Sequence, residues 1–220
     1  MIKKLLVTAV LSLASMSASA TTLVDGGFEA KGAALPVTNY CYDGLATPGG
    51  PACAASPWVG GGVIISGSGP WGGVAAPEGG YYGFVQIDQT VSQSFTATAN
   101  AKGSINWVDR NRPGNLAQNY KVTLSNGVWT YTLGNYSGDL FTFAPRTSAD
   151  FWLVSGDTYT VAFKGLTTYD GTGATDRTVF IDNVALTTMA VPEPATWAML
   201  VVGFGLVGLA RRRSNAVVAA

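Results

Sequence analysis

Histidine is absent from this sequence of 220 residues. Without an imidazole there is no Ser-His-Asp triad, no Cys-His pair and no histidine zinc site. Phosphate-binding and dinucleotide-binding glycine motifs are missing too, because no helical pattern follows Gly60-Gly61-Gly62 or Gly72-Gly73. Catalysis would therefore need a pair of carboxylates, as in glycoside hydrolysis. The aspartates that could supply such a pair, although loop aspartates are usually turn residues, are Asp88, Asp109, Asp170 and Asp176.

Charged residues are scarce, at 12% of the chain, and the 13 basic and 13 acidic side chains balance. Between residues 21 and 189 there are eight basic and twelve acidic side chains, so this segment is mildly negative. A negative segment is a poor partner for polyanions, which argues against binding of nucleic acid. The segment is rich in Gly, Thr, Ser, Tyr and Val, a composition that favours strands over helices.

The N-terminus has the three parts of a secretory signal peptide in the expected order. Lys3-Lys4 precedes an apolar stretch from Leu5 to Leu13, and Ala18-Ser19-Ala20 forms a cleavage site with small residues. We expect residues 1–20 to be removed. Export leads to an oxidising compartment, so the sequence predicts that its two cysteines, Cys41 and Cys53, form a disulfide.

The C-terminus combines a proline pair, an apolar run and a basic cluster. Pro192-Glu193-Pro194 breaks any preceding strand or helix, and the segment from Ala195 to Ala210 has no charged residue. Arg211-Arg212-Arg213 then ends the run. A membrane span usually needs about 20 residues, so this short helix could cross a thin bilayer with the arginines in the cytoplasm.

These C-terminal residues resemble the PEP-CTERM sorting signal. The resemblance covers residues 190–213 and leaves 214–220 as a short tail, where the family usually stops sooner. It implies that an exosortase, a membrane transpeptidase-like enzyme, processes the chain near Pro192-Glu193-Pro194. It also implies a Gram-negative bacterium that makes exopolysaccharide, with the protein exported through the inner membrane to the envelope, outer surface or extracellular matrix.

Between the two signals, apolar and polar residues alternate in repeated short runs. Such alternation predicts half-buried strands. The runs are residues 91–98, 104–107, 120–125, 129–133, 158–164 and 178–187. Asn126-Gly127 suits a hairpin turn between two of them. For residues 21–189 we therefore expect an all-β fold, an antiparallel β-sandwich, without a long helix.

The last run places a carboxylate on the core side. In a regular strand Phe180, Asp182, Val184 and Leu186 share one face, and a buried carboxylate needs backbone amides or a hard cation as its partner. Asp25-Gly26-Gly27-Phe28-Glu29 and the segment from Phe180 to Val184 resemble the first and last motifs of galactose-binding-like jelly rolls. The resemblance implies a structural calcium ion held by Glu29 and Asp182. In the alternative interpretation, Glu29 caps or salt-bridges at the surface and Asp182 binds backbone amides.

Aromatic residues in or beside glycine-rich loops point to sugar binding, because flat rings stack on sugar faces. The candidate glycan-binding residues are Trp58, Trp71, Trp107, Arg110 and Tyr169. Most tryptophans in a sandwich belong to the core, and this alternative applies above all to Trp107 and Trp129. If Trp71, Arg110 and Tyr169 gather at one groove, glycan binding is favoured.

The sequence thus predicts an exported envelope protein that binds exopolysaccharide or another surface polysaccharide without catalysis. A structural or adhesive matrix protein with protein partners is the alternative, and a polysaccharide-active enzyme is a third. An open sheet edge or a flat apolar patch would favour the second, and two carboxylates facing each other in a cleft would favour the third.

Overall fold

The structure of the protein is a computed structural model. It describes residues 22–33, 35, 40–43, 51–67, 71, 74–168, 170–171, 176–190 and 199–208. The predicted signal peptide (1–20), Tyr169, Pro192-Glu193-Pro194, Arg211-Arg212-Arg213 and the tail 214–220 lie outside the described residues.

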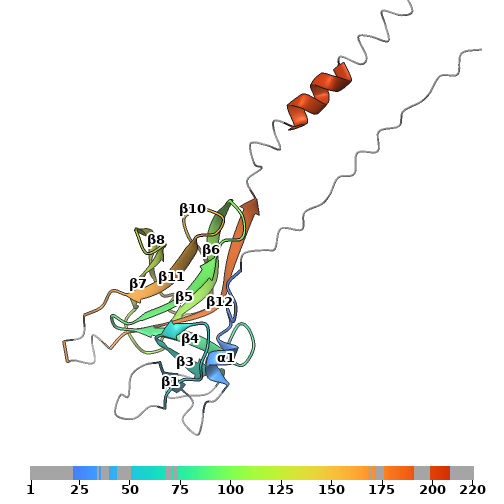
Figure 1. Ribbon diagram of the computed structural model, residues 1–220. Helices are drawn as coiled ribbons and strands as arrows, with labels where there is room; N and C mark the ends of the chain where they lie inside the picture. Colours follow the sequence, from blue (N-terminus) through green and yellow to red (C-terminus); the bar gives the residue numbers. More distant parts are fainter. Residues whose placement is uncertain are drawn as a thin grey trace, which may run out of the picture.

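Two packed antiparallel sheets make up the described part of the chain up to residue 190 (Figure 1). The larger sheet has the order β1 (Tyr40–Tyr42), β3 (Gly62–Ile65), β4 (Tyr81–Gln86), β12 (Thr178–Ala190), β6 (Ala101–Asn111), β10 (Phe151–Leu153), and β9 (Ala144–Thr147) also pairs with β6. The smaller sheet has the order β2 (Val59–Gly60), β5 (Thr90–Thr96), β11 (Thr158–Gly165), β7 (Asn119–Ser125), β8 (Thr130–Ser137). A single helical turn, α1 (Glu29–Gly32), precedes the strands. The predicted β-sandwich is confirmed.

Alternation of side chains creates the main core between the sheets. Along β6 every second residue is buried, so Ile105, Trp107 and Asp109 point inward and their neighbours point out. All six predicted runs overlap β5, β6, β7, β8, β11 and β12. Asn126 and Gly127 lie in the β7–β8 connection, where the Asn126 carboxamide oxygen accepts hydrogen bonds from the backbone N–H groups of Val128 and Trp129.

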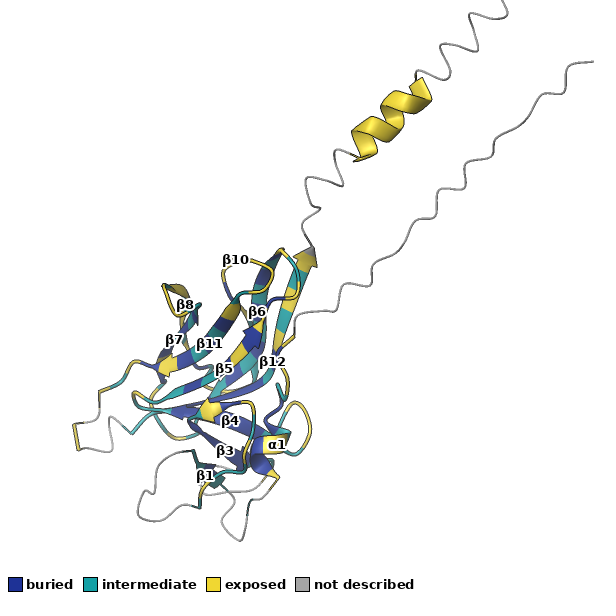
Figure 2. Ribbon diagram, viewed as in Figure 1, coloured by how far each residue is buried: buried dark blue, intermediate teal, exposed yellow. Residues whose placement is uncertain are grey.

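A second hydrophobic cluster covers the outer face of the larger sheet. It contains Ile64, Val74, Tyr82, Phe84 and Phe180, with Trp71 and Phe143 packed against it. Strand β4 is therefore buried on both faces, as Figure 2 shows for this part of the sheet. Its sequence is nearly all apolar and does not alternate, because both of its faces are covered.

Strand β12 contains a β-bulge, so the residues before and after it do not share the single core face that the sequence predicted for Asp182 and its neighbours. The register with β6 shifts between Asp182 and Ala185, and Asn183 has a φ of 54°. Phe180 belongs to the outer cluster, whereas Val184 belongs to the main core. The prediction that Phe180, Asp182 and Val184 share a face was wrong, because the bulge adds one residue and reverses the alternation.

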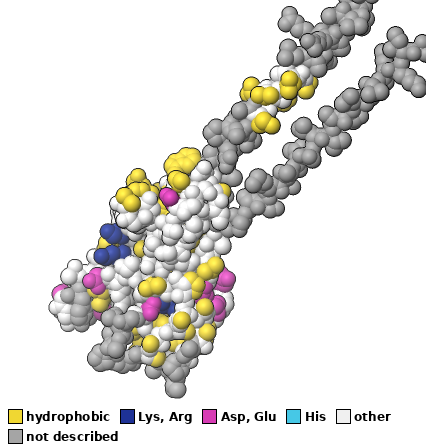
Figure 3. Space-filling view, viewed as in Figure 1, with side chains coloured by type: hydrophobic (Ala, Val, Ile, Leu, Met, Phe, Trp, Pro, Cys, Tyr) yellow, Lys and Arg dark blue, Asp and Glu magenta, His cyan; other side chains and the backbone are white. Residues whose placement is uncertain are grey.

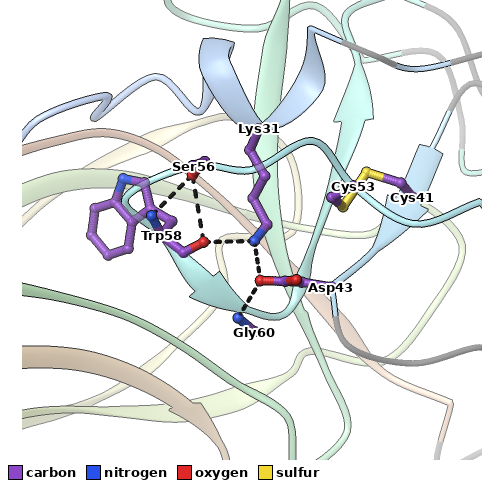
Figure 4. Close-up of a disulfide and its surroundings, with 7 residues drawn as sticks. All are labelled: Lys31, Cys41, Asp43, Cys53, Ser56, Trp58 and Gly60. Atoms are coloured by element: carbon purple, nitrogen blue, oxygen red, sulfur yellow. Dashed lines mark hydrogen bonds and ion pairs between the residues drawn. A yellow bond between two sulfur atoms is a disulfide. The ribbon is translucent and has the colours of Figure 1, made fainter.

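A buried lysine ties α1 to the first strands (Figure 4). Lys31 has no exposed surface, and its Nζ donates hydrogen bonds to Asp43 Oδ2 at 2.7 Å and to the Trp58 carbonyl at 2.8 Å. Asp43 Oδ2 also accepts the N–H of Gly60 at 2.7 Å. Beside this group lies the disulfide between Cys41 and Cys53, which confirms the predicted pair.

The described C-terminal segment, residues 199–208, is helical and exposed along its length (Figure 2). Among the described residues, no helix combines the length and apolar character that crossing a membrane requires. The predicted membrane span extends over flanking residues that lie outside the described part, and it stays a prediction.

We predict that Lys31→Met lowers the free energy of unfolding by about 3 kcal/mol, because breaking a buried ion pair leaves its partners without compensation. Urea unfolding followed by tryptophan fluorescence measures the effect. The matched control is Lys102→Met, since Lys102 forms an exposed pair with Asp150 at 2.6 Å. That control is expected to cost less than about 1 kcal/mol. Equal losses in the two variants would contradict the structural role of Lys31.

Candidate functional site

A pocket of about 440 Å³ opens where the outermost strands of the two sheets, β8 and β10, lie on the same side of the sandwich. Its lining comes from the β7–β8 turn, β8, β10, the segments on either side of β10, and the start of β11. The lining residues are Asn126, Trp129, Tyr131, Thr132, Leu133, Ala149, Asp150, Phe151, Trp152, Val154, Asp157 and Tyr159. Figure 3 shows hydrophobic side chains gathered at the end of the sandwich where Figure 1 labels β8 and β10.

Two large rings of this pocket are exposed to solvent, and strand alternation accounts for one of them. In β10, Phe151 and Leu153 are buried, so Trp152 between them points outward and is 62% exposed. Tyr131 on β8 is 59% exposed. Each strand is paired on one side only, β10 with β6 and β8 with β7, so both are edge strands among those described.

The aromatic rings form an angled surface rather than a flat stack. The ring centroids of Trp129 and Tyr131 lie 4.3 Å apart with 56° between the ring planes, and Tyr159 lies 6.1 Å from Trp129 at a similar tilt. Trp129 and Tyr131 come from the smaller sheet, whereas Trp152 comes from the larger one. The pocket therefore offers rings from both sheets to a ligand.

Polar groups at the pocket include the carboxylates of Asp150 and Asp157, which only accept hydrogen bonds, and the side chains of Asn126 and Thr132, which can also donate. The Tyr159 hydroxyl oxygen accepts the N–H of Val154 at 2.9 Å, and the same hydroxyl donates to Asp157 Oδ2 at 3.4 Å. Asp150 forms an ion pair with Lys102, which lies opposite Trp152 in the β6–β10 register. Aromatic rings beside a few fixed polar groups are typical of small-molecule and sugar sites.

Two of the predicted glycan-binding tryptophans lie in the core instead. Trp58 is 1% exposed and Trp107 is 2% exposed. The indole N–H of Trp58 donates to the Asp25 carbonyl, and that of Trp107 donates to the Tyr120 hydroxyl. Their rings are closed to a sugar, because both residues point into the space between the sheets. The alternative interpretation of Trp107 as a core residue was the right one.

Trp71 and Arg110 lie toward the outer face of the larger sheet, away from this pocket. Trp71 packs against Tyr40 and Phe84, and the Arg112 guanidinium lies 4.9 Å from its ring centroid. Arg110 stands opposite Phe180 in the β6–β12 register. Tyr169 lies outside the described residues, so the predicted grouping of Trp71, Arg110 and Tyr169 stays a prediction.

From the sequence, Trp129 was predicted to be a core residue, and neither Tyr131 nor Trp152 was among the candidate site residues. One sequence signal could have found Trp152. It lies between Phe151 and Leu153, and if those two residues point inward, the tryptophan must point outward. No local pattern indicates that β8 and β10 end up on the same side of the sandwich, because their approach depends on the fold of the whole chain.

Two of the four candidate catalytic aspartates, Asp109 and Asp176, are held by hydrogen bonds and ion pairs. Asp109 is fully buried and accepts hydrogen bonds from the Tyr120 hydroxyl at 2.5 Å and from Arg146 Nε at 3.0 Å. Burial raises the pKa of the Asp109 carboxyl, although the hydrogen bond from Tyr120 and the charge of Arg146 act in the opposite direction. Asp176 is engaged by Gln86 Nε2 and by Arg112.

The two predicted calcium ligands both accept backbone hydrogen bonds. Glu29 Oε1 accepts the N–H groups of Gly80 and Tyr81, and Asp182 accepts those of Glu78 and Asn183. Burial is the largest cause that raises the pKa of Asp182 to about 7; the backbone hydrogen bonds from Glu78 and Asn183 lower this pKa, and the negative charges of Glu78 and Glu29 help to raise it. These bonds match the alternative interpretation of Asp182.

A calcium ion would meet oxygen donors here, which is the chemistry it requires. Glycines leave the room for these carboxylates: a Cβ at Gly27 would lie 3.6 Å from Asp182 Oδ1, and one at Gly79 would lie 2.2 Å from Glu29 Oε1. Among the described residues, however, no three His, Cys, Asp or Glu side chains gather closely enough to hold a metal. The side chains could supply only part of a coordination shell, with carbonyls and water supplying the rest.

Residues 190–214 match the PEP-CTERM protein-sorting motif. This match confirms the resemblance based on Pro192, Glu193, Pro194 and the three arginines. The chain is therefore a secreted protein with a C-terminal sorting signal. Strand β12 ends at Ala190, so the motif begins where the sandwich ends.

Comparison with curated protein sequences gave no match. Among solved structures, the chain is similar to TmCBM61 in complex with β-1,4-galactotriose, with 14% identity, coverage of 78% of this chain and 100% of the other, and a TM-score of 0.46. It is also similar to the CBM22-1 xylan-binding domain of Paenibacillus barcinonensis Xyn10C, with 9% identity, coverage of 76% and 94%, and a TM-score of 0.46. A third is the K1 cleaved adhesin domain of Lys-gingipain from Porphyromonas gingivalis, with 15% identity, coverage of 63% and 93%, and a TM-score of 0.41. Scores this low do not identify a shared function.

Proposed function

We propose that this exported protein is a non-catalytic glycan-binding protein and that the glycan binds in the pocket between β8 and β10. The observation that carries the proposal is the exposure of Trp152 and Tyr131, on opposite sheets, at one pocket. Large exposed rings that gather at one place mark binding sites, because leaving them in water gives up the free energy of their burial. A sugar offers an apolar C–H face to such rings and hydroxyl groups to the polar atoms around them.

The polar lining supports a glycan over a purely apolar ligand. Asn126, Asp150 and Asp157 surround the rings, and a hydroxyl-rich ligand would replace the hydrogen bonds that these groups make with water. An apolar ligand would leave them without partners. The pocket volume of about 440 Å³ lies within the range of ligand sites, about 300–1,000 Å³.

The sorting signal supports a proposed place of action. We propose that an exosortase of a Gram-negative bacterium processes the chain near Pro192-Glu193-Pro194, after the C-terminal helix has held it in the inner membrane. The protein would then act in the envelope or extracellular matrix, where exopolysaccharide is the available glycan. What supports this is the match of residues 190–214 to the sorting motif.

An adhesive matrix protein with protein partners is the second candidate. Leu140 and Phe141 lie exposed in the connection between β8 and β9, and Phe141 is 78% exposed. These apolar side chains could contact another protein. They also provide a control surface for testing the glycan pocket, because neither residue lines it.

We predict that Trp152→Ala and Tyr131→Ala each weaken binding to polysaccharide at least tenfold, since central aromatic contacts contribute most of the energy at such sites. Affinity electrophoresis of the full-length protein, in gels containing galactan, xylan or the host exopolysaccharide, measures this directly. Phe141→Ala is the matched control, because it removes an exposed ring outside the pocket. It is expected to leave retardation unchanged.

Two outcomes would contradict the proposal. If no gel retards the wild-type protein, the second candidate function gains support. If Phe141→Ala weakens binding as much as Trp152→Ala does, the glycan binds elsewhere. Thermal unfolding of each variant shows whether a loss of binding reflects a loss of fold.

We also propose a structural calcium ion between the first loop and β12, held in part by Glu29 and Asp182. What supports it is the crowding of acidic oxygens near Gly27 and Gly79. A cation would offset this crowding of negative charge.

We predict that calcium raises the melting temperature of the chelator-treated protein by several degrees. A ligand at a concentration 100 times its Kd stabilises the folded state by about 2.7 kcal/mol. Differential scanning calorimetry with calcium, with magnesium and with chelator measures the shift. Asp182→Asn should remove most of it, and an unchanged melting temperature in the wild type would refute the site.

A further inference from the structure

We infer that the pocket between β8 and β10 selects uncharged glycans and rejects acidic ones such as polyuronates and sulfated polysaccharides. This inference rests on the proposed function and adds a substrate class to it. It comes from the charge and hydrogen-bonding character of the lining, which differ from what a carboxylate or sulfate group needs. The rings alone do not discriminate, because neutral and acidic sugars both have an apolar face.

The lining carries two negative side chains and no positive one. Asp150 and Asp157 are both lining residues, and no lysine or arginine is among them. Asp150 is paired with Lys102, whose Nζ lies 2.6 Å from Asp150 Oδ2. An acidic sugar entering the pocket would meet two carboxylates, one of which already engages that lysine. Like charges brought together in this way weaken binding and give selectivity.

The hydrogen-bonding groups of the two aspartates also favour a neutral ligand over an acidic one. The Tyr159 hydroxyl hydrogen is directed to Asp157 Oδ2, and the Asn126 carboxamide oxygen is engaged by the turn. A carboxylate has only acceptor oxygens to offer, so at Asp150 and Asp157 it finds no donor. Hydroxyl groups can donate to both aspartates. The two aspartates therefore favour ligands that donate hydrogen bonds, although the Asn126 amide NH2 and the Thr132 hydroxyl of the lining can donate as well.

Other basic groups of the protein are engaged away from the pocket. Arg146 forms an ion pair with the buried Asp109, and Arg112 forms one with Asp176 beside Trp71. None of these residues lines the pocket. An acidic glycan whose sugar rings contact Trp152 and Tyr131 would therefore gain little electrostatic attraction from these arginines.

A matched pair of ligands tests the inference. Guar galactomannan is neutral, and oxidation of its primary alcohols to carboxylates gives an acidic polymer with the same backbone. We expect the full-length wild-type protein to bind the neutral polymer at least tenfold more tightly in affinity electrophoresis at low salt. If guar does not retard the protein, the neutral polysaccharide that does retard it is oxidised in the same way.

The double variant Asp150→Asn/Asp157→Asn isolates the cause. Asparagine keeps the shape of the side chain and adds donors, so the preference ratio between the two polymers is expected to fall below about threefold. Asp88→Asn, in the exposed turn between β4 and β5, is the control and should keep the wild-type ratio. High salt should lower the ratio of the wild type, because it screens exposed charges.

Each result has one meaning. Binding of the neutral polymer with a large ratio that collapses in the double variant supports the inference. Equal binding of both polymers, or tighter binding of the acidic one, overturns the inference while leaving the proposed function in place. If none of the neutral or acidic polymers binds the wild type, the proposed function itself fails.

Discussion

The pairing of β6 with β12 is the constraint on which the rest of the structure depends. β6 lies inside the larger sheet, with β12 on one side and both β9 and β10 on the other. Its register places Lys102 opposite Met189 on β12 and opposite Trp152 on β10. Thus the same few residues of β6 set the position of the pocket wall and the point where the chain leaves the sandwich for its sorting motif.

Because of the bulge in this pairing, β12 contributes side chains to both hydrophobic clusters. Before Asn183, β12 directs Phe180 to the outer cluster, and after it Val184 joins the main core. Asp182 lies at the change of phase, where backbone amides of Glu78 and Asn183 bind its carboxylate. These amides satisfy a group whose burial would otherwise cost several kcal/mol.

Six of the longer strands could be predicted from the alternation of apolar and polar residues, whereas strands that are very short or buried on both faces could not. β5, β6, β7 and β11 each bury one face, so their apolar residues repeat with the period of a strand. β4 buries both faces, and β9 and β10 are too short for a periodic signal. The apolar–polar alternation does not indicate the bulge at Asn183, which puts Phe180 on the outer face while Val184 keeps its expected place in the core.

The candidate site was harder to predict than the fold, whereas the sorting signal was easier. Pro192-Glu193-Pro194 and the arginines act as a linear motif, so sequence alone is sufficient to recognise them. The pocket instead requires β8 and β10, which follow different strands and belong to different sheets, to meet at one side of the sandwich. Nothing local separates an inward tryptophan such as Trp107 from an outward one such as Trp152 except the phase of its strand.

The central claim is that Trp152 and Tyr131 form the walls of a sugar site. The most direct measurement is a crystal structure of the protein with a neutral oligosaccharide that it binds in solution. Our account predicts a sugar ring in contact with Trp152 and Tyr131, with its hydroxyl groups directed to Asp150 or Asp157. A sugar bound instead over Trp71 and Arg112, on the outer face of the larger sheet, would contradict it.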